Sequence, residues 1–238
     1  TVSADVGETD ASQFLVKGGS YILLEETAPK GYALNAEYIP FTFGENGSTE
    51  VTCENAPLAL TVSKKDLADG AEIAGAHLVL TDHDESNSLV DEWDSAANTS
   101  HEVEAAKLTA GHTYTLTETI VPDGYIRSQT VQFKIQPDGT VSLVGGAGSV
   151  NGTNVVMTDD RTLLSIEKTG IANASLTEGV QFTLYASDAE GTKGLQVGSE
   201  GLAFNRLIPG GYYWLYETTV PQGYVPMAPL HFQFTYDA

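Results

Sequence analysis

The stretch of sequence that decides the fold is YTLTETIVPDGY, residues 114–125. It alternates apolar and polar side chains and then reaches an Asp-Gly pair, which is the pattern of a half-buried β-strand followed by a tight turn. The same pattern occurs as YILLEETAPKGY at residues 21–32 and as YWLYETTVPQGY at residues 213–224. Its proline recurs at spacings of 93 and 99 residues, which is the length of a small domain and too long for a solenoid repeat. The sequence therefore predicts three related units in a row.

The rest of the chain also carries strand signals. Apolar and polar residues alternate over 58–64 and over 131–135, and Asn-Gly or Asp-Gly pairs, which favour tight hairpin turns, separate such segments. No stretch keeps a 3.6-residue period between helix caps. We therefore predict an all-β chain of tandem immunoglobulin-like β-sandwich domains.

A second repeat marks the junctions between the units. The segments Val51–Asn55 and Val155–Asp159 are alike, and each ends nine residues before a lysine, Lys64 or Lys168. Flexible linkers would be richer in Gly and Ser, so the units are expected to be closely coupled. The expected units are 1–56, which lacks its opening strand, 57–160, which is complete, and 161–238, which lacks its last strand. This arrangement suggests a segment of a longer array.

Composition excludes several classes of function. The 238 residues include 32 acidic and 11 basic side chains, a net charge of −21, which argues against binding to nucleic acid or to anionic membrane surfaces. Cys53 is the single cysteine, so an internal disulfide and a cysteine-ligated zinc site are excluded. No apolar run reaches the roughly 18 residues of a membrane helix, and the five histidines lack metal-ligand spacing. We expect no metal, no cofactor and no membrane insertion in this segment.

Three ionisable residues occupy inward-facing positions of the middle unit. Alternation places Lys64 on the face of the apolar residues that precede it, and it places Glu118 and Asp159 on the apolar faces of their own strands. Lone buried charges are costly, so this placement needs a reason. One interpretation is a buried salt-bridge network. The other is covalent: a neutral lysine amine attacks a protonated carboxylic acid and forms an amide.

Burial supports the covalent interpretation. Desolvation favours the neutral forms of amine and acid, Glu118 can relay a proton between them, and the fold supplies a high effective concentration. Aspartate would lose water in this reaction, whereas an asparagine such as Asn55 would lose ammonia. Asp160 and Lys65 are alternatives one residue out of register, but alternation and the nine-residue spacing favour Asp159 and Lys64.

The chain resembles the tandem SpaA-like, Cna protein B-type (prealbumin-like) repeats of Gram-positive surface adhesins and pilins. The resemblance rests on SKKD at 63–66, AGA at 74–76, the ET and PDGY parts of 118–125, and VVMTD at 155–159. It implies that Lys64 of the first strand bonds to Asp159 of the last strand, with Glu118 as the proton relay. The outer repeats match in part, with Glu25 and Asn55 in the first and Lys168 and Glu217 in the third.

The resemblance also implies a mechanical function. The chain is expected to be a stalk or shaft of a surface adhesin or pilin, rigidified by autocatalytic isopeptide bonds, and not an enzyme, because each bond forms once. The expected location is extracellular, with a cell-wall anchor outside this segment. Expected partners are neighbouring repeats of the same chain and, through other domains, a host surface protein or glycan. Two alternatives are an adhesive module that binds host protein or glycan through exposed tyrosines, and an accessory stalk of a secreted enzyme.

Two further patterns have competing interpretations. Residues 82–88 imitate the start of a calcium-binding loop, but Asn87 stands in place of the glycine and Trp93 in place of the terminal glutamate. We interpret this segment as a hairpin turn. The incomplete outer units suggest that separate molecules complement each other head to tail, in which case Lys168 would face Asn55 of a neighbour.

Overall fold

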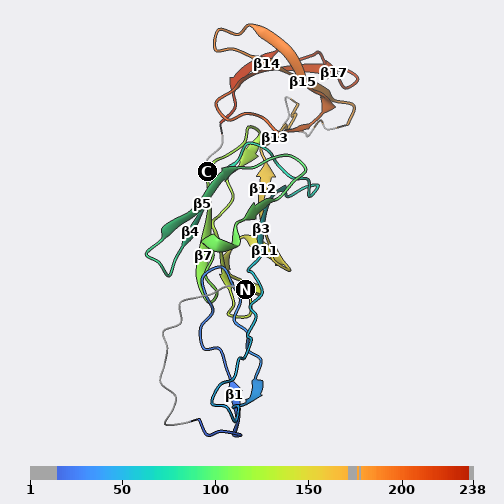
Figure 1. Ribbon diagram of the computed structural model, residues 1–238. Helices are drawn as coiled ribbons and strands as arrows, with labels where there is room; N and C mark the ends of the chain where they lie inside the picture. Colours follow the sequence, from blue (N-terminus) through green and yellow to red (C-terminus); the bar gives the residue numbers. More distant parts are fainter. Residues whose placement is uncertain (1–14, 171–175, 177, 236–238) are drawn as a thin grey trace.

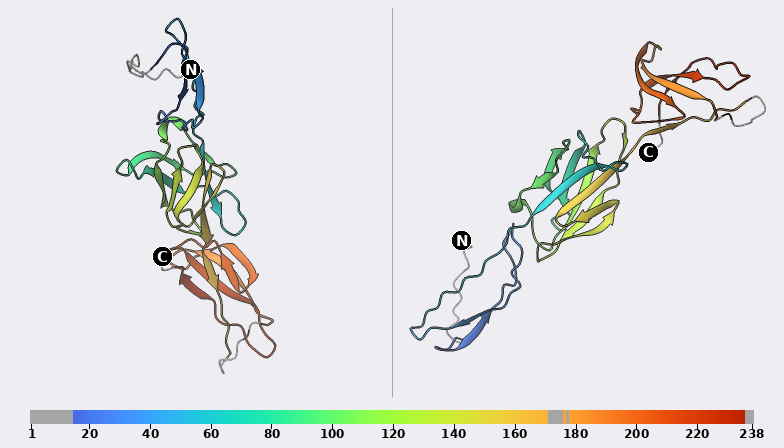
Figure 2. Two further views of the ribbon diagram at one scale, coloured as in Figure 1. Left: turned by 90° about the horizontal axis from the view of Figure 1, so that it is seen from below. Right: turned by 90° about the vertical axis from the view of Figure 1, so that its right-hand side faces the viewer.

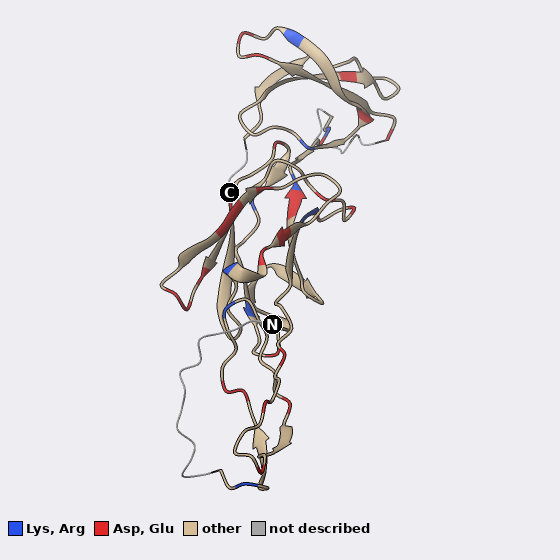
Figure 3. Cartoon of the chain, viewed as in Figure 1, with Lys and Arg blue, Asp and Glu red and all other residues tan. Residues whose placement is uncertain are grey.

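The computed structural model describes residues 15–170, 176 and 178–235. Three β-rich parts follow one another along the molecule (Figures 1 and 2): a first unit with β1 and β2, a middle unit with β3 to β12, and a third unit with β13 to β18. Acidic residues are spread over all three units, whereas lysines and arginines are sparse (Figure 3). The described residues contain one short 3-10 helix, η1 (Ala105–Lys107), and no α-helix. The expectation of an all-β chain is confirmed.

No described helix has the length and apolar character needed to cross a membrane.

The middle unit is a sandwich of two sheets. One sheet is antiparallel, in the order β10 (Val141–Gly146), β9 (Val131–Ile135), β7 (Thr113–Ile120), β4 (His77–Asp82) and β5 (Ser88–Asp94). The other has the order β11 (Gly148–Asn151), β12 (Asn154–Arg161), β3 (Leu60–Asp66) and β6 (His101–Val103), and β8 (Tyr125–Ile126) pairs with the end of β12. Strands β3 and β12, the first and last of the unit, pair in parallel with Lys64 opposite Met157. This pairing brings residues from opposite ends of the unit's sequence side by side.

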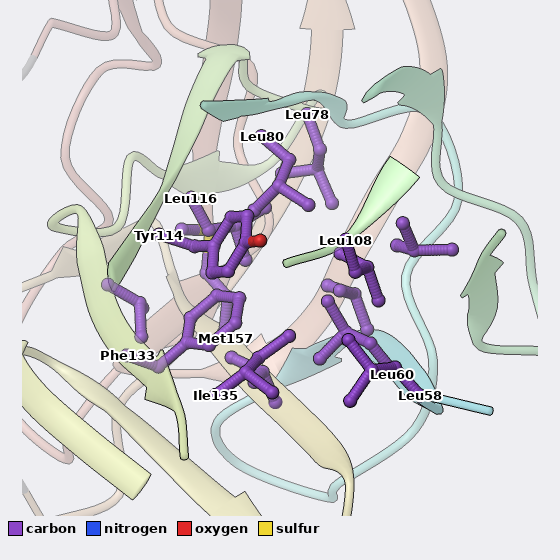
Figure 4. Packing of buried hydrophobic residues seen from close by; sticks show 14 of the residues in the cluster. Leu58, Leu60, Leu78, Leu80, Leu108, Tyr114, Leu116, Phe133, Ile135 and Met157 are labelled. Atoms are coloured by element: carbon purple, nitrogen blue, oxygen red, sulfur yellow. The ribbon is translucent and has the colours of Figure 1, made fainter. Parts of the chain in front are cut away.

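The core of the middle unit lies between these sheets (Figure 4). Leu60 and Val62 of β3 are buried, as are Met157 of β12 and Leu116 of β7. Tyr114 of β7 stacks on a neighbouring ring of β9, with 5.7 Å between the ring centroids. The predicted alternation therefore corresponds to the pleat of real strands, with one face of each strand turned into the core.

The repeated stretch has the same structural roles in all three units. The hydroxyl of its first tyrosine accepts a hydrogen bond from the backbone N–H five residues earlier, at 2.6 Å for Tyr21, 2.7 Å for Tyr114 and 2.9 Å for Tyr213. Its glycine adopts a positive φ of 88° at Gly31, 84° at Gly124 and 89° at Gly223, which other residues adopt only with strain. These shared roles explain why the tyrosine and the glycine recur.

The third unit contains two sheets with fewer strands. One has the order β15 (Lys193–Gly201), β14 (Gln181–Ser187), β17 (Tyr212–Thr219) and β18 (Leu230–Gln233), and the other pairs β13 (Leu163–Ser165) with β16 (Ala203–Asn205). A small core that includes Phe182, Leu184 and Leu215 lies between them. Within the described residues, no strand pairs with β13 in parallel as β12 does with β3.

The first unit has the simplest structure. Strands β1 (Ser20–Leu23) and β2 (Ile39–Thr42) form an antiparallel pair, with Tyr21 opposite Phe41. Ile22 is 62% exposed and Leu23 is 37% exposed. The sequence pattern of β1 is that of the middle unit, but the described part of the first unit has no second sheet to cover these side chains.

Candidate functional site

The three ionisable residues singled out in the middle unit meet inside its core. Lys64 projects from β3, Asp159 from the adjacent strand β12, and Glu118 from β7 of the opposite sheet. The exposed fraction is 2% for Lys64, 2% for Glu118 and 0% for Asp159. Because the parallel register sets Lys64 opposite Met157, Asp159 lies two residues further along β12 on the same face. The sandwich thus brings an amine and two carboxyl groups together away from solvent.

The Lys64 amine is the centre of this group. Its Nζ donates a short hydrogen bond to Asp159 Oδ1, and it lies 3.1 Å from Glu118 Oε1 as an ion pair. It also donates to the hydroxyl of Ser128 at 2.9 Å. The amine is therefore held by contacts from three different segments of the middle unit.

Burial dominates the electrostatics of Glu118. Desolvation raises the pKa of its carboxyl group, the nearby Asp159 charge raises it further, and the Lys64 ammonium opposes both effects. Two oxygens of the site, Glu118 Oε1 and Asp159 Oδ2, are buried without a hydrogen bond of good geometry among the described residues. A protonated Glu118 would turn one such orphaned acceptor into a donor. The geometry and the burial of the site therefore favour a protonated Glu118 carboxyl group.

The residues adjacent in sequence are placed differently. Asp160 is exposed, and its carboxylate accepts the backbone N–H of Arg161 at 2.8 Å. Lys65 is partly buried on the other face of β3, 3.9 Å from Glu72. The structure thus brings Lys64 and Asp159 together and leaves Lys65 and Asp160 outside the site.

Ser128 is the member of the site that the sequence did not reveal. It belongs to no recognisable motif, and it reaches the site because its backbone N–H donates to Glu118 Oε2 at 3.1 Å. The signal that could have found it is a spacing of ten residues. In the outer units, the N–H groups of Asn35 and Met227 bond in the same way to Glu25 and Glu217, at 2.8 Å and 2.7 Å.

A family model described as the SpaA prealbumin-like fold domain matches residues 2–57, 59–147 and 162–237. The chain belongs to this family. The suspected relationship is therefore confirmed, and so is the fold class of repeated prealbumin-like β-sandwich domains.

Several solved structures are similar to this prealbumin-like chain. The Bacillus anthracis TIE protein is 22% identical over 90% of this chain and 39% of its own, with a TM-score of 0.37. A C-terminal fragment of the pilus adhesin SpaC from Lactobacillus rhamnosus GG is 19% identical over 75% of this chain and 81% of its own, with a TM-score of 0.32. A mutant of the shaft pilin SpaA from the same organism is 14% identical over 75% of this chain and 94% of its own, with a TM-score of 0.32. The chain therefore spans well under half of the Bacillus anthracis protein. No curated protein sequence matches the chain.

The two outer prealbumin-like units each contain part of the same arrangement. In the first unit, Asn55 Nδ2 donates to Glu25 Oε2 at 2.6 Å, and both residues are half-buried. In the third unit, Lys168 Nζ donates to Glu217 Oε2 at 3.0 Å, and the Glu217 side chain is fully buried. Among the described residues, no lysine contacts Glu25 and no Asn or Asp side chain contacts the Lys168 amine. Within the described part of the chain, each outer unit thus brings together its predicted pair but not a third partner.

A second buried charge, Asp66, lies at the joint between the middle and third prealbumin-like units. Its Oδ2 accepts hydrogen bonds from Tyr125 at 2.9 Å, from Arg161 at 2.7 Å and from Arg206 of the third unit at 2.9 Å. Burial alone would raise the pKa of Asp66, but these bonds and the N–H of Ala68 lower it well below its usual range. Asp66 therefore stays ionised and connects the two units.

The turns at the end of the first and second repeated stretches contribute to the joints as well. The carbonyl of Gly31 accepts the N–H of Leu58 at 2.8 Å, and the carbonyl of Gly124 accepts the N–H of Thr162 at 3.0 Å. In both cases the donor begins the next unit. The Pro-Xaa-Gly-Tyr turn thus has a physical role in coupling successive units.

Two other clusters do not add a reactive site. Asp82, Glu85 and His112 have ligand atoms within 4.8 Å of one another, but Asp82 Oδ1 accepts the N–H groups of Asp84 and Glu85 and so organises the β4–β5 hairpin turn. The aromatic run at 212–216 is divided by the strand pleat. Tyr213 is buried in the core of the third unit. Tyr216 instead packs under Lys193, whose Nζ lies 4.4 Å from the centroid of the Tyr216 ring.

Proposed function

We propose that this chain is a stalk segment of a Gram-positive surface adhesin or pilin, and that its middle unit is locked by an amide bond between Lys64 and Asp159. The observation that carries the proposal is the burial of one amine against two carboxyl groups, at 0–2% exposure, between the first and last strands of the unit. Such a group would be a poor source of stability as an ion pair, because the desolvation of each charge offsets the attraction. Conversion to a neutral amide removes that cost.

The proposed reaction needs no outside reagent. A protonated Glu118 gives its proton to the Asp159 carboxylate and takes one from the Lys64 ammonium, which leaves a neutral amine beside a neutral acid. The Nζ–Cγ bond then forms, the Cγ–O bond of Asp159 breaks, and the departing hydroxyl leaves as water with a proton passed on from nitrogen. Glu118 ends protonated, as it began, so atoms and charge balance.

The surroundings support this chemistry. The raised pKa of Glu118 keeps its carboxyl group protonated further up the pH range than an exposed glutamate, as a proton relay requires. A cavity of about 90 Å³ adjoins Lys64 and is lined in part by Trp93 and His101. It is large enough for the departing water.

The position of the bond suits a chain under tension. Because β3 and β12 are parallel, a pull that enters at Leu60 and leaves at Arg161 shears one strand along the other. A bond between Lys64 and Asp159 would carry that load from one strand directly to the next. The chain between these two residues, which are 95 positions apart, would then bear no force. Stiffness along the chain is the property that a stalk needs. Because the bond forms once in each molecule, the unit does not act as an enzyme in this proposal.

The wider assignments rest on the same proposal. We assign the units to residues 1–56, 57–160 and 161–238, with Glu25–Asn55 and Lys168–Glu217 as the parts of related sites in the outer two. The proposed location is the cell exterior, and the proposed partners are neighbouring repeats. Cross-links of this kind would replace disulfides, which a chain with one cysteine cannot form internally.

The intact mass of the purified chain tests the proposal. We expect a mass lower than that of the sequence by one water, with the missing water assigned by peptide mapping to a branched peptide that joins Lys64 to Asp159. A full, unreduced mass would contradict the cross-link.

A further inference from the structure

We propose that the Ser128 hydroxyl relays the proton from the Lys64 amine to Glu118 and is a second catalytic group of the middle unit, beside Glu118. The inference rests on the proposed Lys64–Asp159 bond and adds a residue to its mechanism. Ser128 lies just after β8, is half-buried, and reaches between two fully buried side chains.

The hydrogen-bond geometry carries the argument. Ser128 Oγ accepts from Lys64 Nζ at 2.9 Å and lies 3.4 Å from Glu118 Oε2, to which it donates. The second bond is long for an O–H···O contact, and such bonds tighten when a reaction begins. The backbone N–H of Ser128 holds the same Oε2 at 3.1 Å. One residue thus fixes both the position of the Glu118 carboxyl group and its connection to the amine.

The direct route from the amine to Glu118 is less well aligned. Nζ and Oε1 are 3.1 Å apart as an ion pair, yet no described residue gives Oε1 a hydrogen bond of good geometry. Proton transfer follows hydrogen bonds, so the aligned path from Nζ to this carboxyl group runs through Ser128 Oγ. In that path the ammonium proton moves to Oγ as the hydroxyl proton moves to Oε2. Ser128 is unchanged at the end.

The third unit provides a comparison within the same chain. There Lys168 Nζ donates directly to Glu217 Oε2 at 3.0 Å, and the position equivalent to Ser128 is Met227, which has no hydroxyl and bonds to Glu217 through its N–H at 2.7 Å. The amine and carboxyl group of that unit are already joined without an intermediary. A relay is therefore needed in the middle unit, where Glu118 Oε1 lacks a hydrogen bond among the described residues, and not in the third unit.

The test measures how fast the bond forms in the full chain. Protein is made by cell-free translation, samples are stopped in denaturant at intervals, and the fraction that has lost one water is read by mass spectrometry. We expect Ser128→Ala to slow bond formation by roughly tenfold or more, the effect of losing one hydrogen bond to a charged group. Ser128→Thr, which keeps the hydroxyl, should restore most of the rate. Ser149→Ala is the matched control, because Ser149 is exposed on β11 of the same unit, and it should react as the wild type does.

Two further measurements separate a relay from a structural role. The slowing of the reaction in heavy water should be larger for the wild type than for Ser128→Ala, because the relay moves two protons and the direct route moves one. If Ser128→Ala does not fold by circular dichroism, Ser128→Cys keeps the side-chain shape with a poor hydrogen-bonding group and should be slow as well.

The outcomes are distinct. Equal rates in Ser128→Ala, or in Ser128→Cys where the alanine variant does not fold, would overturn the relay, as would an unchanged isotope effect. A wild-type chain that never loses water would instead contradict the proposed function.

Discussion

Lys64 and Asp159 are 95 residues apart in the chain and yet hydrogen-bonded within the core. The parallel pairing of β3 with β12 accounts for this contact, because it sets the end of the first strand beside the end of the last one. A bond at this point closes nearly the whole middle unit into one ring. The stability and the mechanical behaviour of the unit are therefore expected to depend on two side chains.

Replacement of Lys64 by methionine removes the amine and keeps much of the side-chain volume. We expect Lys64→Met to have its full sequence mass and to lose about 4–5 kcal/mol of unfolding free energy, the loop-entropy value for a cross-link of this span. For a domain of this size that corresponds to a fall in melting temperature on the order of 20 °C. Lys65→Met, which changes a partly exposed lysine outside the site, is the control and should keep both the water loss and the melting temperature. A Lys64→Met chain as stable as the wild type would show that no cross-link supports the fold.

Replacement of Asp159 by asparagine tests the nature of the leaving group. The amide has the same shape as the acid, so Lys64 should still attack it, but the departing molecule is then ammonia. We expect Asp159→Asn to be lighter than its sequence by one ammonia, which high-resolution intact-mass measurement distinguishes from water. The Asp160→Asn variant should still lose water, since Asp160 is exposed. Loss of ammonia from the Asp160 variant would place the acceptor one residue later.

Bond formation should depend on pH through Glu118. Burial raises the pKa of this carboxyl group, and the reaction uses its protonated form. The rate is therefore expected to be highest below the raised pKa and to fall as the pH increases through it. In Glu118→Gln, where the group cannot exchange a proton, we expect no measurable water loss at any pH. Glu92→Gln, at an exposed position of β5, should follow the wild-type profile, and a rate that increases steadily with pH would argue against a protonated Glu118.

Much of the fold and part of the site could be predicted from the sequence. The alternation around Glu118 places the side chain in the core, and the period of two makes Asp159, not Asp160, its neighbour. Ser128 does not follow from strand alternation, because a loop after β8 brings it to the site; its spacing of ten residues from Glu118, which recurs in the outer units, is the signal that could have found it. Asp66 was missed for a related reason. One of its partners is Arg206 of another unit, and such contacts between units are not encoded in any local pattern.

The first unit shows the limit of pattern alone. Its repeated stretch matches that of the middle unit, and Tyr21 makes the same hydroxyl bond as Tyr114. Yet Ile22 and Leu23 remain exposed, because the described residues provide no second sheet to cover them. Local sequence determines the strand and its anchor, whereas burial requires a partner surface.

Two glycines at equivalent positions test the coupling between units. Gly124 and Gly223 have nearly the same φ, 84° and 89°, so alanine should cost each about 1 kcal/mol of backbone strain. A Cβ at Gly124 would lie 3.0 Å from the backbone of Arg206, whereas one at Gly223 would meet nothing within 4 Å. We expect Gly124→Ala to disturb the joint in addition, with a broader range of molecular dimensions in small-angle X-ray scattering. Identical scattering for the two variants would indicate that this turn does not hold the units in place.

The Asp66 carboxylate should make the joint sensitive to acid. Its pKa is lowered in the folded chain from an ordinary value of 3.8, so its contribution to stability is fully present above that pH and declines as the pH falls below it. We expect Asp66→Asn to lose roughly 2–4 kcal/mol at neutral pH, because two arginines and a tyrosine lose a charged acceptor. The variant should also have a flatter stability profile between about pH 4 and pH 2, measured by denaturant unfolding. Asp69→Asn is the matched control, since its side chain is 49% exposed and, besides its ion pair with Arg161, accepts only the backbone N–H of Ala71 at 3.0 Å among the described residues. It should change stability by less than about 1 kcal/mol. If Asp66→Asn keeps the wild-type slope in acid, then Asp66 does not control the acid sensitivity of the joint.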